Sequence, residues 1–379
     1  MIRFEPLEAR LVLSARAVDA VNAFAGDLYE HMQNETGNLA FSPLSVATAM
    51  GMLYGAAGGQ TADEIAAVFH LGTEPGIHSA FRSLIRKLES PRATIEVTAP
   101  WLNEWHRQSP LWSGVAFDDL SQEAQWEVLF AIPTELWLEH NYEYSVWEPT
   151  YETSIANAVW PQAGAPIDAE YLGLVRNSYL GHVEGLDYSA KAEAARERIN
   201  EWVEAETEGR IVDLLPAGAL DAGTALVLTN ALYFKAKWDT PFIRESTHFA
   251  TFHLSDGESV DVPMMVNQYD ELSSTVIDGY SVYDLPFESG GSSTSPGSMR
   301  IVLQRQADGA GVLSAETVAR INAWDADEPY VVSGCPDNFY LPKFEIRVET
   351  DLASALAGMG MPSAFGGDAN FPSIGAGTY

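Results

Sequence analysis

Residues 224–234 read TALVLTNALYF, and this stretch decides the fold class of the chain. Apolar and β-branched residues follow one another almost without a break, which is typical of a strand covered on both faces. The stretch therefore predicts a strand in the centre of a large sheet. Asn230 lies in the middle of it, and its amide group must find a buried hydrogen-bond partner.

Around this strand the sequence mixes helices with strands. Apolar residues at helical spacing predict a helix over Ala195–Glu206, with Gly209 beyond its end. A flexible loop, Ser289–Ser298 (SGGSSTSPGS), separates two predicted strands at hairpin distance. The predicted strands after residue 234 are Ser259–Met265, Ser281–Pro286, Arg300–Gln304 and Asn338–Glu349. Because the elements do not alternate as regular βαβ units, the predicted fold class is α+β.

The N-terminal part predicts three helices. Apolar residues recur at intervals of three and four from Ala17 to Met32. Ser42 is the predicted N-cap of a second helix, with a proline at its first position. Thr61 is predicted to cap the third helix, and Glu64 completes a capping box.

Residues 101–150 have a different composition. Six of the ten tryptophans lie here, with nine acidic residues and a single base, Arg107. Tryptophans at this density need burial, so we expect an insertion that folds back on the main body. A platform for a partner or a carbohydrate is the alternative, because stacked indole rings suit both. The tryptophans are Trp101, Trp105, Trp112, Trp126, Trp137 and Trp147.

The charge balance excludes several classes of partner. Among the 379 residues, 53 acids face 21 bases, which gives a net charge of −32. Binding to nucleic acid needs clustered Lys and Arg, so no nucleic-acid partner is expected. Docking on an anionic membrane surface is disfavoured for the same reason, and no stretch has the roughly 18 apolar residues of a membrane span.

Met1–Ala15 reads MIRFEPLEARLVLSA, and charged residues interrupt it where a standard signal peptide is apolar. It resembles the motif F-E-P-L-E-x-R-x-L-L-S-A at the start of many bacterial secreted and surface proteins. The resemblance implies an extracellular or cell-surface location, with the cytoplasm as the alternative. A polar leader to the first helix is the other interpretation of this segment.

Residue patterns of common enzymes do not occur in the sequence. It contains no G-x-S-x-G elbow, no phosphate-binding glycine loop and no H-E-x-x-H. His182 is interpreted as a surface or satisfied histidine, and Cys335 as a small hydrophobe. Asp325, Asp327 and Glu328 lack the spacing of a calcium loop. The sequence therefore favours a binding or structural protein over an enzyme, with no metal and no cofactor.

Several motifs, in a fixed order, resemble the serpin (serine protease inhibitor) family. The motifs are Asn38–Ser45 (NLAFSPLS), Gly55–Thr61 (GAAGGQT), Tyr151–Trp160 (YETSIANAVW), Ile199–Val203 (INEWV), Leu226–Lys235 (LVLTNALYFK), Val262–Met265 (VPMM) and Leu341–Phe344 (LPKF). The resemblance implies the serpin fold, with a large mixed main sheet and surrounding helices, over residues 16–379. The insertion at about 101–150 interrupts it, and residues 1–15 form the leader.

The resemblance also implies an activity and the residues that serve it. In serpins an exposed loop is offered as bait to a serine or cysteine protease, and after cleavage it inserts into the main sheet. Ser42, Ser45 and Asn230 match the family's shutter, where exchangeable hydrogen bonds let strands part. Trp238 and Lys343 match the breach, where insertion begins. Alternatively, these five residues only satisfy a buried core.

The sequence departs from the family pattern at its C-terminal end. Serpins continue for several dozen residues after the segment that matches Asp368–Ile374, through a sheet strand, a hinge, the reactive loop and two core strands. No hinge pattern occurs within residues 1–379, so no reactive bond can be named, and we expect a C-terminally truncated serpin.

Three functions stay open at this point. The first is serine-type endopeptidase inhibition by loop insertion, the family activity, with the loop outside this sequence. The second is a non-inhibitory serpin-derived binding module, and the third is an inactive truncated product. Self-association through open sheet edges is expected in any of these cases.

Overall fold

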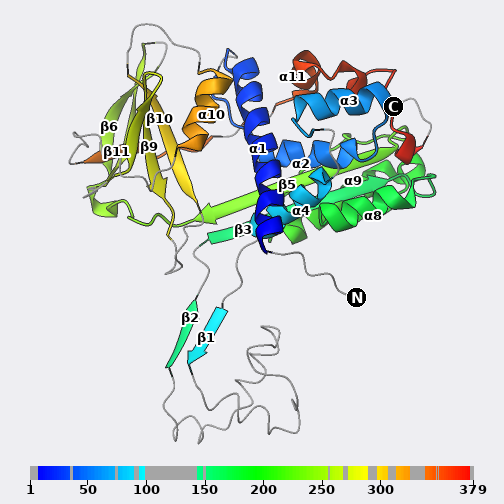
Figure 1. Ribbon diagram of the computed structural model, residues 1–379, viewed down its shortest axis with the longest axis horizontal. Coiled ribbons are helices and arrows are strands. Elements are labelled where there is room, and N and C mark those ends of the chain that lie inside the picture. The colour runs from blue at the N-terminus through cyan, green and yellow to red at the C-terminus, as the bar shows by residue number, and fades with distance from the viewer. Residues whose placement is uncertain are drawn as a thin grey trace, which may run out of the picture.

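A computed structural model gives the arrangement of the chain (Figure 1). It describes residues 7–34, 37–72, 76–88, 94–98, 143–147, 151–254, 257–267, 272–288, 297–305, 313–324, 338–346, 348 and 350–375. Helices surround a pair of long strands, and shorter strands form two further small sheets at one end of the molecule (Figure 1). The α+β class predicted from the sequence is confirmed.

The long strands are β3 (Tyr151–Pro161) and β5 (Leu226–Ala236), which pair antiparallel over their whole length. β4 (His182–Val183) pairs parallel with β3, so the order is β4-β3-β5. The prediction that β5 lies in the centre of a sheet is wrong for the described strands, because β5 is at the edge. An apolar run indicates that both faces of a strand are covered. It does not indicate whether the strand is paired at each of its edges.

The two faces of this sheet build two separate cores, because successive side chains of a strand point to opposite sides. On one face Ala156, Ala158 and Trp160 pack with Ile199 and Val203 of α9 (Tyr188–Glu206). On the other face Val159 belongs to the larger core of the helical layer. The sheet is therefore the middle of three layers.

The helical layer contains α1 (Leu7–Met32), α2 (Pro43–Tyr54), α3 (Gly59–Val68), α4 (Ile77–Leu88), α8 (Ala169–Ser178) and α11 (Leu352–Met359). Phe24 of α1 and Phe69 pack with ring centroids 4.3 Å apart, and both side chains are fully buried. The apolar spacing in α1 predicted this contact face, although the helix begins ten residues earlier than Ala17 and includes much of the predicted leader.

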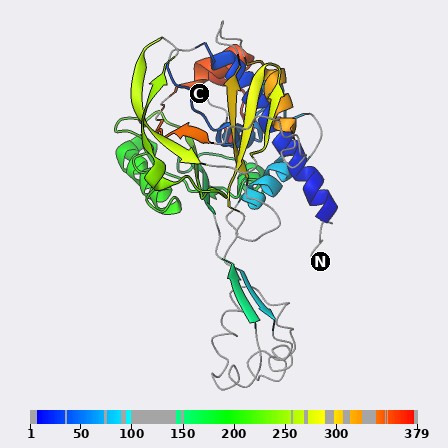
Figure 2. The ribbon, with the colours of Figure 1, turned by 90° about the vertical axis from the view of Figure 1, so that its left-hand side faces the viewer.

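At the other end of the molecule two small sheets face each other (Figure 2). One has the order β10 (Ser298–Gln304), β9 (Tyr280–Pro286) and β8 (Ser274–Ile277); the other has the order β11 (Phe339–Pro342), β7 (Ser259–Asn267) and β6 (His248–His253). Leu285 from the first and Leu341 from the second share one core. α10 (Ala315–Ala323) packs on α1. The hairpin predicted around 289–298 is the antiparallel pair β9–β10.

The predicted strand Asn338–Glu349 is wrong in its second half. Its ladder with β7 ends at Pro342. Beyond it Phe344, Ile346 and Val348 are exposed to 56%, 42% and 37%. These residues alternate as a strand requires, but within the described residues no strand pairs with them.

Of the two predicted N-caps, one is correct. Ser42 caps α2, because its Oγ accepts a hydrogen bond from the Ser45 N–H at 3.2 Å. The capping box on α3 is wrong, since the helix begins at Gly59. Thr61 and Glu64 instead bind the C-terminal segment: Thr61 Oγ1 accepts from the Asn370 N–H, and the Glu64 carboxylate accepts from the backbone and hydroxyl of Ser363.

The base of the insertion is described but its centre is not. β1 (Thr94–Thr98) and β2 (Glu143–Trp147) pair antiparallel and extend away from the helices and the other sheets (Figures 1 and 2). Residues 99–142 lie outside the described part, so packing of the insertion on the body stays a prediction. Cys335 and the acidic residues 325–328 also lie outside it.

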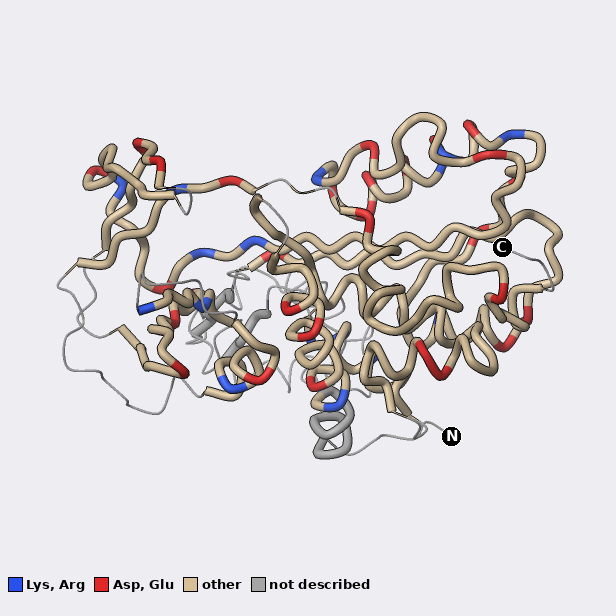
Figure 3. The backbone as a smooth tube through the Cα atoms, turned by 90° about the horizontal axis from the view of Figure 1, so that it is seen from above, with Lys and Arg blue, Asp and Glu red and all other residues tan. Residues whose placement is uncertain are grey.

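Acidic residues are spread along the whole described backbone rather than gathered on one face (Figure 3). Within the described residues, no group of three or more His, Cys, Asp or Glu side chains is placed to hold a metal ion. None of the described helices has both the length and the apolar character needed to cross a membrane.

We predict that Ser42→Ala lowers the free energy of unfolding by about 1 kcal/mol, because it removes the side-chain cap of α2. Ser42→Asp keeps a capping oxygen and should stay near the parent protein. Ser83→Ala is the control, since Ser83 Oγ donates to the Ser79 carbonyl inside α4 and caps nothing. Urea unfolding measures all three; equal effects of Ser42→Ala and Ser83→Ala would contradict the capping role.

Candidate functional site

Two asparagines meet at the centre of the long strand pair. Asn157 of β3 and Asn230 of β5 lie directly opposite each other in the ladder. Asn230 Nδ2 donates to Asn157 Oδ1 at 2.6 Å, and Asn157 Nδ2 donates to the Tyr179 carbonyl at 2.9 Å. Asn157 is 2% exposed. The buried partner that the sequence required for Asn230 is therefore Asn157.

One acceptor in this pair is left over. Among the described residues Asn230 Oδ1 is buried and has no hydrogen-bond partner. A buried polar atom without a partner costs about 1–3 kcal/mol. Asn230 lies on β5, which is an edge strand among the described strands. The unsatisfied acceptor therefore belongs to the strand that could pair with an added strand.

The hydrogen-bonded residues Asn230, Asn157, Tyr179 and His78 form a polar layer. From Asn157 it continues into the helices through Tyr179, which follows α8. The Tyr179 hydroxyl lies 2.7 Å from His78 Nδ1 of α4. It also approaches α2 so closely that a Cβ on Gly51 would lie 2.6 Å from it, which is why this position is a glycine. The layer thus connects β5, β3, α8, α2 and α4.

The His78–Tyr179 pair is neutral. Burial raises the pKa of the Tyr179 phenol, and the nearby Tyr171 and Tyr54 raise it further. Burial lowers the pKa of His78, which lies between the rings of Tyr54 and Tyr179. At neutral pH the phenol therefore keeps its O–H and the imidazole carries a single N–H, and a further proton on His78 would place a charge in the core.

The structure brings the three shutter-like residues only partly together. Ser42 and Ser45 lie at the start of α2, which packs on β5. Asn230, however, bonds to Asn157, which the sequence reasoning missed. A signal was present, because Asn157 is a lone amide in the apolar run YETSIANAVW, as Asn230 is in its own strand.

The two breach-like residues lie near the core between the small sheets. Trp238 follows β5, forms a bridge with Phe287 and packs its ring 5.3 Å from the ring of that residue. Trp238 and Leu341 belong to the same core. The Lys343 backbone N–H donates to the Pro263 carbonyl at 2.8 Å, and its side chain is exposed. The two residues therefore lie in the same region of the described structure.

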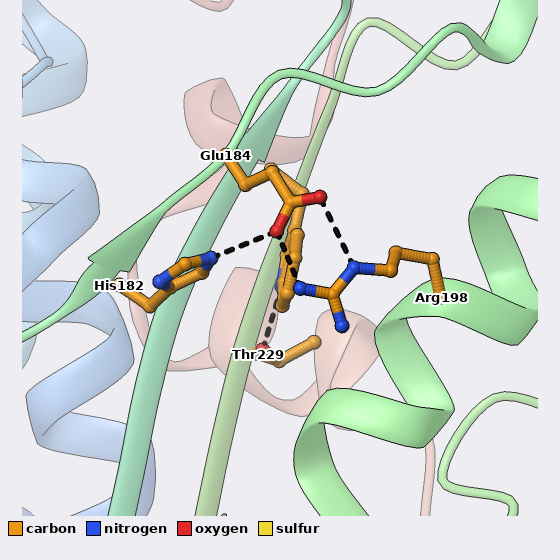
Figure 4. Close-up of polar contacts among 5 residues, drawn as sticks. His182, Glu184, Arg198 and Thr229 are labelled. Carbon is orange, nitrogen blue, oxygen red and sulfur yellow. Dashed lines mark hydrogen bonds and ion pairs between the residues drawn. The ribbon is translucent and has the colours of Figure 1, made fainter.

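A second cluster lies on the opposite face of the sheet (Figure 4). The Glu184 carboxylate accepts from Arg198 Nε at 3.1 Å and Nη2 at 2.8 Å, and its Oε2 lies 3.1 Å from His182 Nε2. Burial alone would raise the pKa of Glu184, but the hydrogen bonds from Arg198 and His182 outweigh burial and lower it. His182 is thus the satisfied histidine that was expected.

Trp160 connects this cluster to the sheet. Its indole N–H donates to Thr229 Oγ1 at 3.0 Å across the β3–β5 pair, and its ring packs edge-on against Trp202 of α9. Trp202 also stacks on the ring of His182, at 5.2 Å and 23°, a contact for which the sequence carries no signal.

Comparisons with known proteins agree with this architecture. The family model described as Serpin (serine protease inhibitor) matches residues 19–103 and 134–378. An uncharacterized serpin-like protein of Thermococcus kodakarensis is 32% identical over 353 residues, which cover 92% of this chain and 66% of the relative. The chain therefore spans just under two thirds of the length of that relative.

Two further comparisons cover a vertebrate inhibitor and a solved structure. Plasminogen activator inhibitor 1 of Mus musculus is 36% identical over 221 residues, covering 56% of this chain and 52% of that protein. Ovalbumin from emu has the same fold, with a TM-score of 0.67 at 21% identity over 96% of this chain and 82% of its own.

The polar layer predicts an order of mutational effects. Asn157→Ala should lower the free energy of unfolding by about 2–3 kcal/mol, because it leaves Asn230 Nδ2 and the Tyr179 carbonyl without partners. Asn230→Ala removes the same volume and leaves Asn157 Oδ1 without its donor, but it also removes the unpartnered Oδ1, so it should cost only about 1 kcal/mol. Urea unfolding of both variants tests the order, and the reverse order would show that Oδ1 is satisfied.

The buried His78 predicts acid sensitivity. Its folded-state pKa lies below the unfolded value of about 6.5, so its contribution to stability is present above that pH and is lost as the pH falls through it. His78→Gln should reduce the loss of unfolding free energy between pH 8 and pH 5, and His253→Gln, an exposed control, should not. The same pH slope in all three proteins would refute a buried neutral His78.

Proposed function

The chain belongs to the serpin family, and from this premise we propose that it acts by the family mechanism, inhibition of serine-type endopeptidases through loop insertion. In this proposal it is an inhibitor and not an enzyme. Residues 1–379 provide the body that receives the inserted strand. The proposal names no reactive bond within residues 1–379.

One observation carries the proposal: among the described residues no strand pairs with the second edge of β5, and Asn230 Oδ1 inside the sheet has no hydrogen-bond partner. Unpaired N–H and C=O groups along a strand edge accept an added strand. An added strand that brings a hydrogen-bond donor to Asn230 would also satisfy its buried Oδ1. In this proposal the sheet would open beside the start of α2, which carries Ser42 and Ser45, and near Trp238 and Lys343.

The partners in this proposal are serine or cysteine proteases. The excess of acidic residues gives the inhibitor a long-range attraction to basic proteases, which depends on salt. We also propose an extracellular or cell-surface location, from the motif within Met1–Ala15.

A second function is favoured by the insertion. The family match omits residues 104–133, which lie within the tryptophan-rich segment. A binding module would use these tryptophans for a partner and the serpin body as its scaffold. Such a module would need no reactive loop.

The test is incubation with trypsin-like, chymotrypsin-like, subtilisin-like and papain-like proteases, followed by a denaturing gel. We expect residues 1–379 alone to give no denaturation-resistant band at the summed mass, because the acyl bond requires a bait residue. The same chain extended by a serpin hinge and reactive loop should give such a band with at least one protease.

Two results would contradict the proposal. A resistant band from residues 1–379 alone would place a bait residue inside them. A folded, extended chain that traps none of the proteases would favour the binding module. Reading the gene downstream of Tyr379 for a hinge and loop is the quickest supporting observation.

A further inference from the structure

β6 is an edge strand without the residues that usually prevent an edge from pairing. It forms one side of the sheet β11-β7-β6, and among the described strands none pairs with its second edge (Figure 1). Its sequence, HFATFH, contains no Lys, Arg, Asp, Glu or Pro, the residues that normally keep an edge strand from pairing with another chain. The other described edge strands are shorter or carry a charged residue, such as Lys235 of β5 and Arg300 of β10.

Apolar side chains are exposed along this edge. Phe249 is 74% exposed, and Phe252 and Leu254 are 41% and 37% exposed. Covering them is favourable, because it removes apolar surface from water. β6 therefore offers both backbone groups and apolar side chains to a partner strand.

The hydrogen bonds to β7 show which residues of β6 face the free edge. The Leu254 N–H donates to the Glu258 carbonyl at 2.8 Å, so the backbone groups of Leu254 point toward the β7 side. In an antiparallel ladder such residues alternate with residues whose N–H and C=O point the other way. The backbone groups of Phe249, Thr251 and His253 therefore point to the free edge.

We propose that β6 pairs antiparallel with β6 of a second copy of this chain, with Thr251 of the two copies opposite each other. This register places Phe249 opposite His253 of the second copy and Ala250 opposite Phe252. Phe249, Thr251 and His253 then exchange backbone hydrogen bonds with the same three positions of the other copy. The two small sheets β11-β7-β6 would thus join into one sheet across a two-fold axis.

The side chains that meet in this register are compatible. Thr251 faces a threonine, the ring of Phe249 faces an imidazole, and the small Ala250 leaves room for Phe252. Threonine pairs and aromatic pairs across two strands are both favourable. Just outside these positions His248 faces Leu254, so all three exposed apolar side chains gain a neighbour and no like charges are opposed within the strand.

The charges at the two ends of β6 complement each other in the same arrangement. Arg244 lies just before the strand, and Glu258 lies in the turn that follows it. Antiparallel pairing brings the start of one β6 to the end of the other, so Arg244 of each copy approaches Glu258 of the other. Glu245, beside Arg244, offsets part of this attraction. The edge therefore fits a second copy of itself in shape, hydrogen bonding and charge.

The net charge of the molecule opposes the pairing from a distance. Each copy carries −32, and salt screens the repulsion between like-charged molecules. Because β6 itself is uncharged, salt weakens the repulsion without removing the contacts of the strand pair. One strand pair is also a small interface, so we expect a weak dimer that becomes about three- to tenfold stronger between about 0.1 M and 1 M salt.

Sedimentation equilibrium of the full chain at up to about 0.1 mM, in both salts, tests the proposal. The parent protein should show a monomer–dimer equilibrium that salt strengthens. Thr251→Pro removes an N–H that points to the free edge and none that bonds to β7, so it should weaken the dimer at least about tenfold. Thr251→Val is the matched control, since it keeps the N–H and the branched side chain, and it should stay within about twofold of the parent.

A charge exchange tests the register itself. Thr251→Lys or Thr251→Glu alone places like charges opposite each other on the two-fold axis, so each should dimerise more weakly than the parent in about 0.1 M salt. Mixing the two variants pairs opposite charges and should give a mixed dimer at least about threefold stronger than either variant alone. Thermal unfolding verifies that each variant is folded.

Three results would overturn the proposal: a parent protein that stays monomeric in both salts, a folded Thr251→Pro that dimerises as the parent does, or a mixture that dimerises no better than its components. The second result would place the contact on another strand edge. None of the variants alters β5, so the outcome does not depend on the proposed function.

Discussion

The hydrogen bond between Asn157 and Asn230 is the constraint on which the rest of the structure depends. It joins the two strands near the middle of an eleven-residue ladder, at one defined position. A slip by one residue would turn every side chain of β5 to the wrong face and leave two amides unpaired in the core. The bond therefore determines which residues face the helical layer and which face α9.

The two faces have different chemistry because of that register. Toward the helical layer, the polar chain runs through Tyr179 to a histidine that is kept neutral. Toward α9, His182 contacts the Glu184 carboxylate and stacks on the Trp202 indole. One sheet thus separates a buried, hydrogen-bonded histidine from one at the surface of an ion-pair cluster. An added strand in this sheet, which the proposed function requires, would alter the packing around both histidines.

Parts of this arrangement could be predicted from the sequence, and others could not. Asn230 needs a partner because a buried amide without a hydrogen bond is costly in any fold. Ser42 is predictable as a cap because the first N–H groups of every helix lack partners within the helix. Thr61 had the local signature of a cap but serves Asn370, more than three hundred residues away. Similarly, the apolar run of β5 indicates that its faces are covered but not that one edge is unpaired among the described strands. The alternating residues of Phe344–Val348 have the pattern of a strand, but the pattern does not show whether a partner strand exists.

The central claim is that β5 presents an unpaired edge to an incoming strand. Alternate amides of Leu226–Ala236 point toward β3 and toward the open edge, so residue-resolved hydrogen exchange of this strand tests the claim most directly. The account predicts slow exchange at the amides bonded to β3 and fast exchange at those between them. Uniformly slow exchange along the whole of β5 would show that both edges are paired and would contradict it.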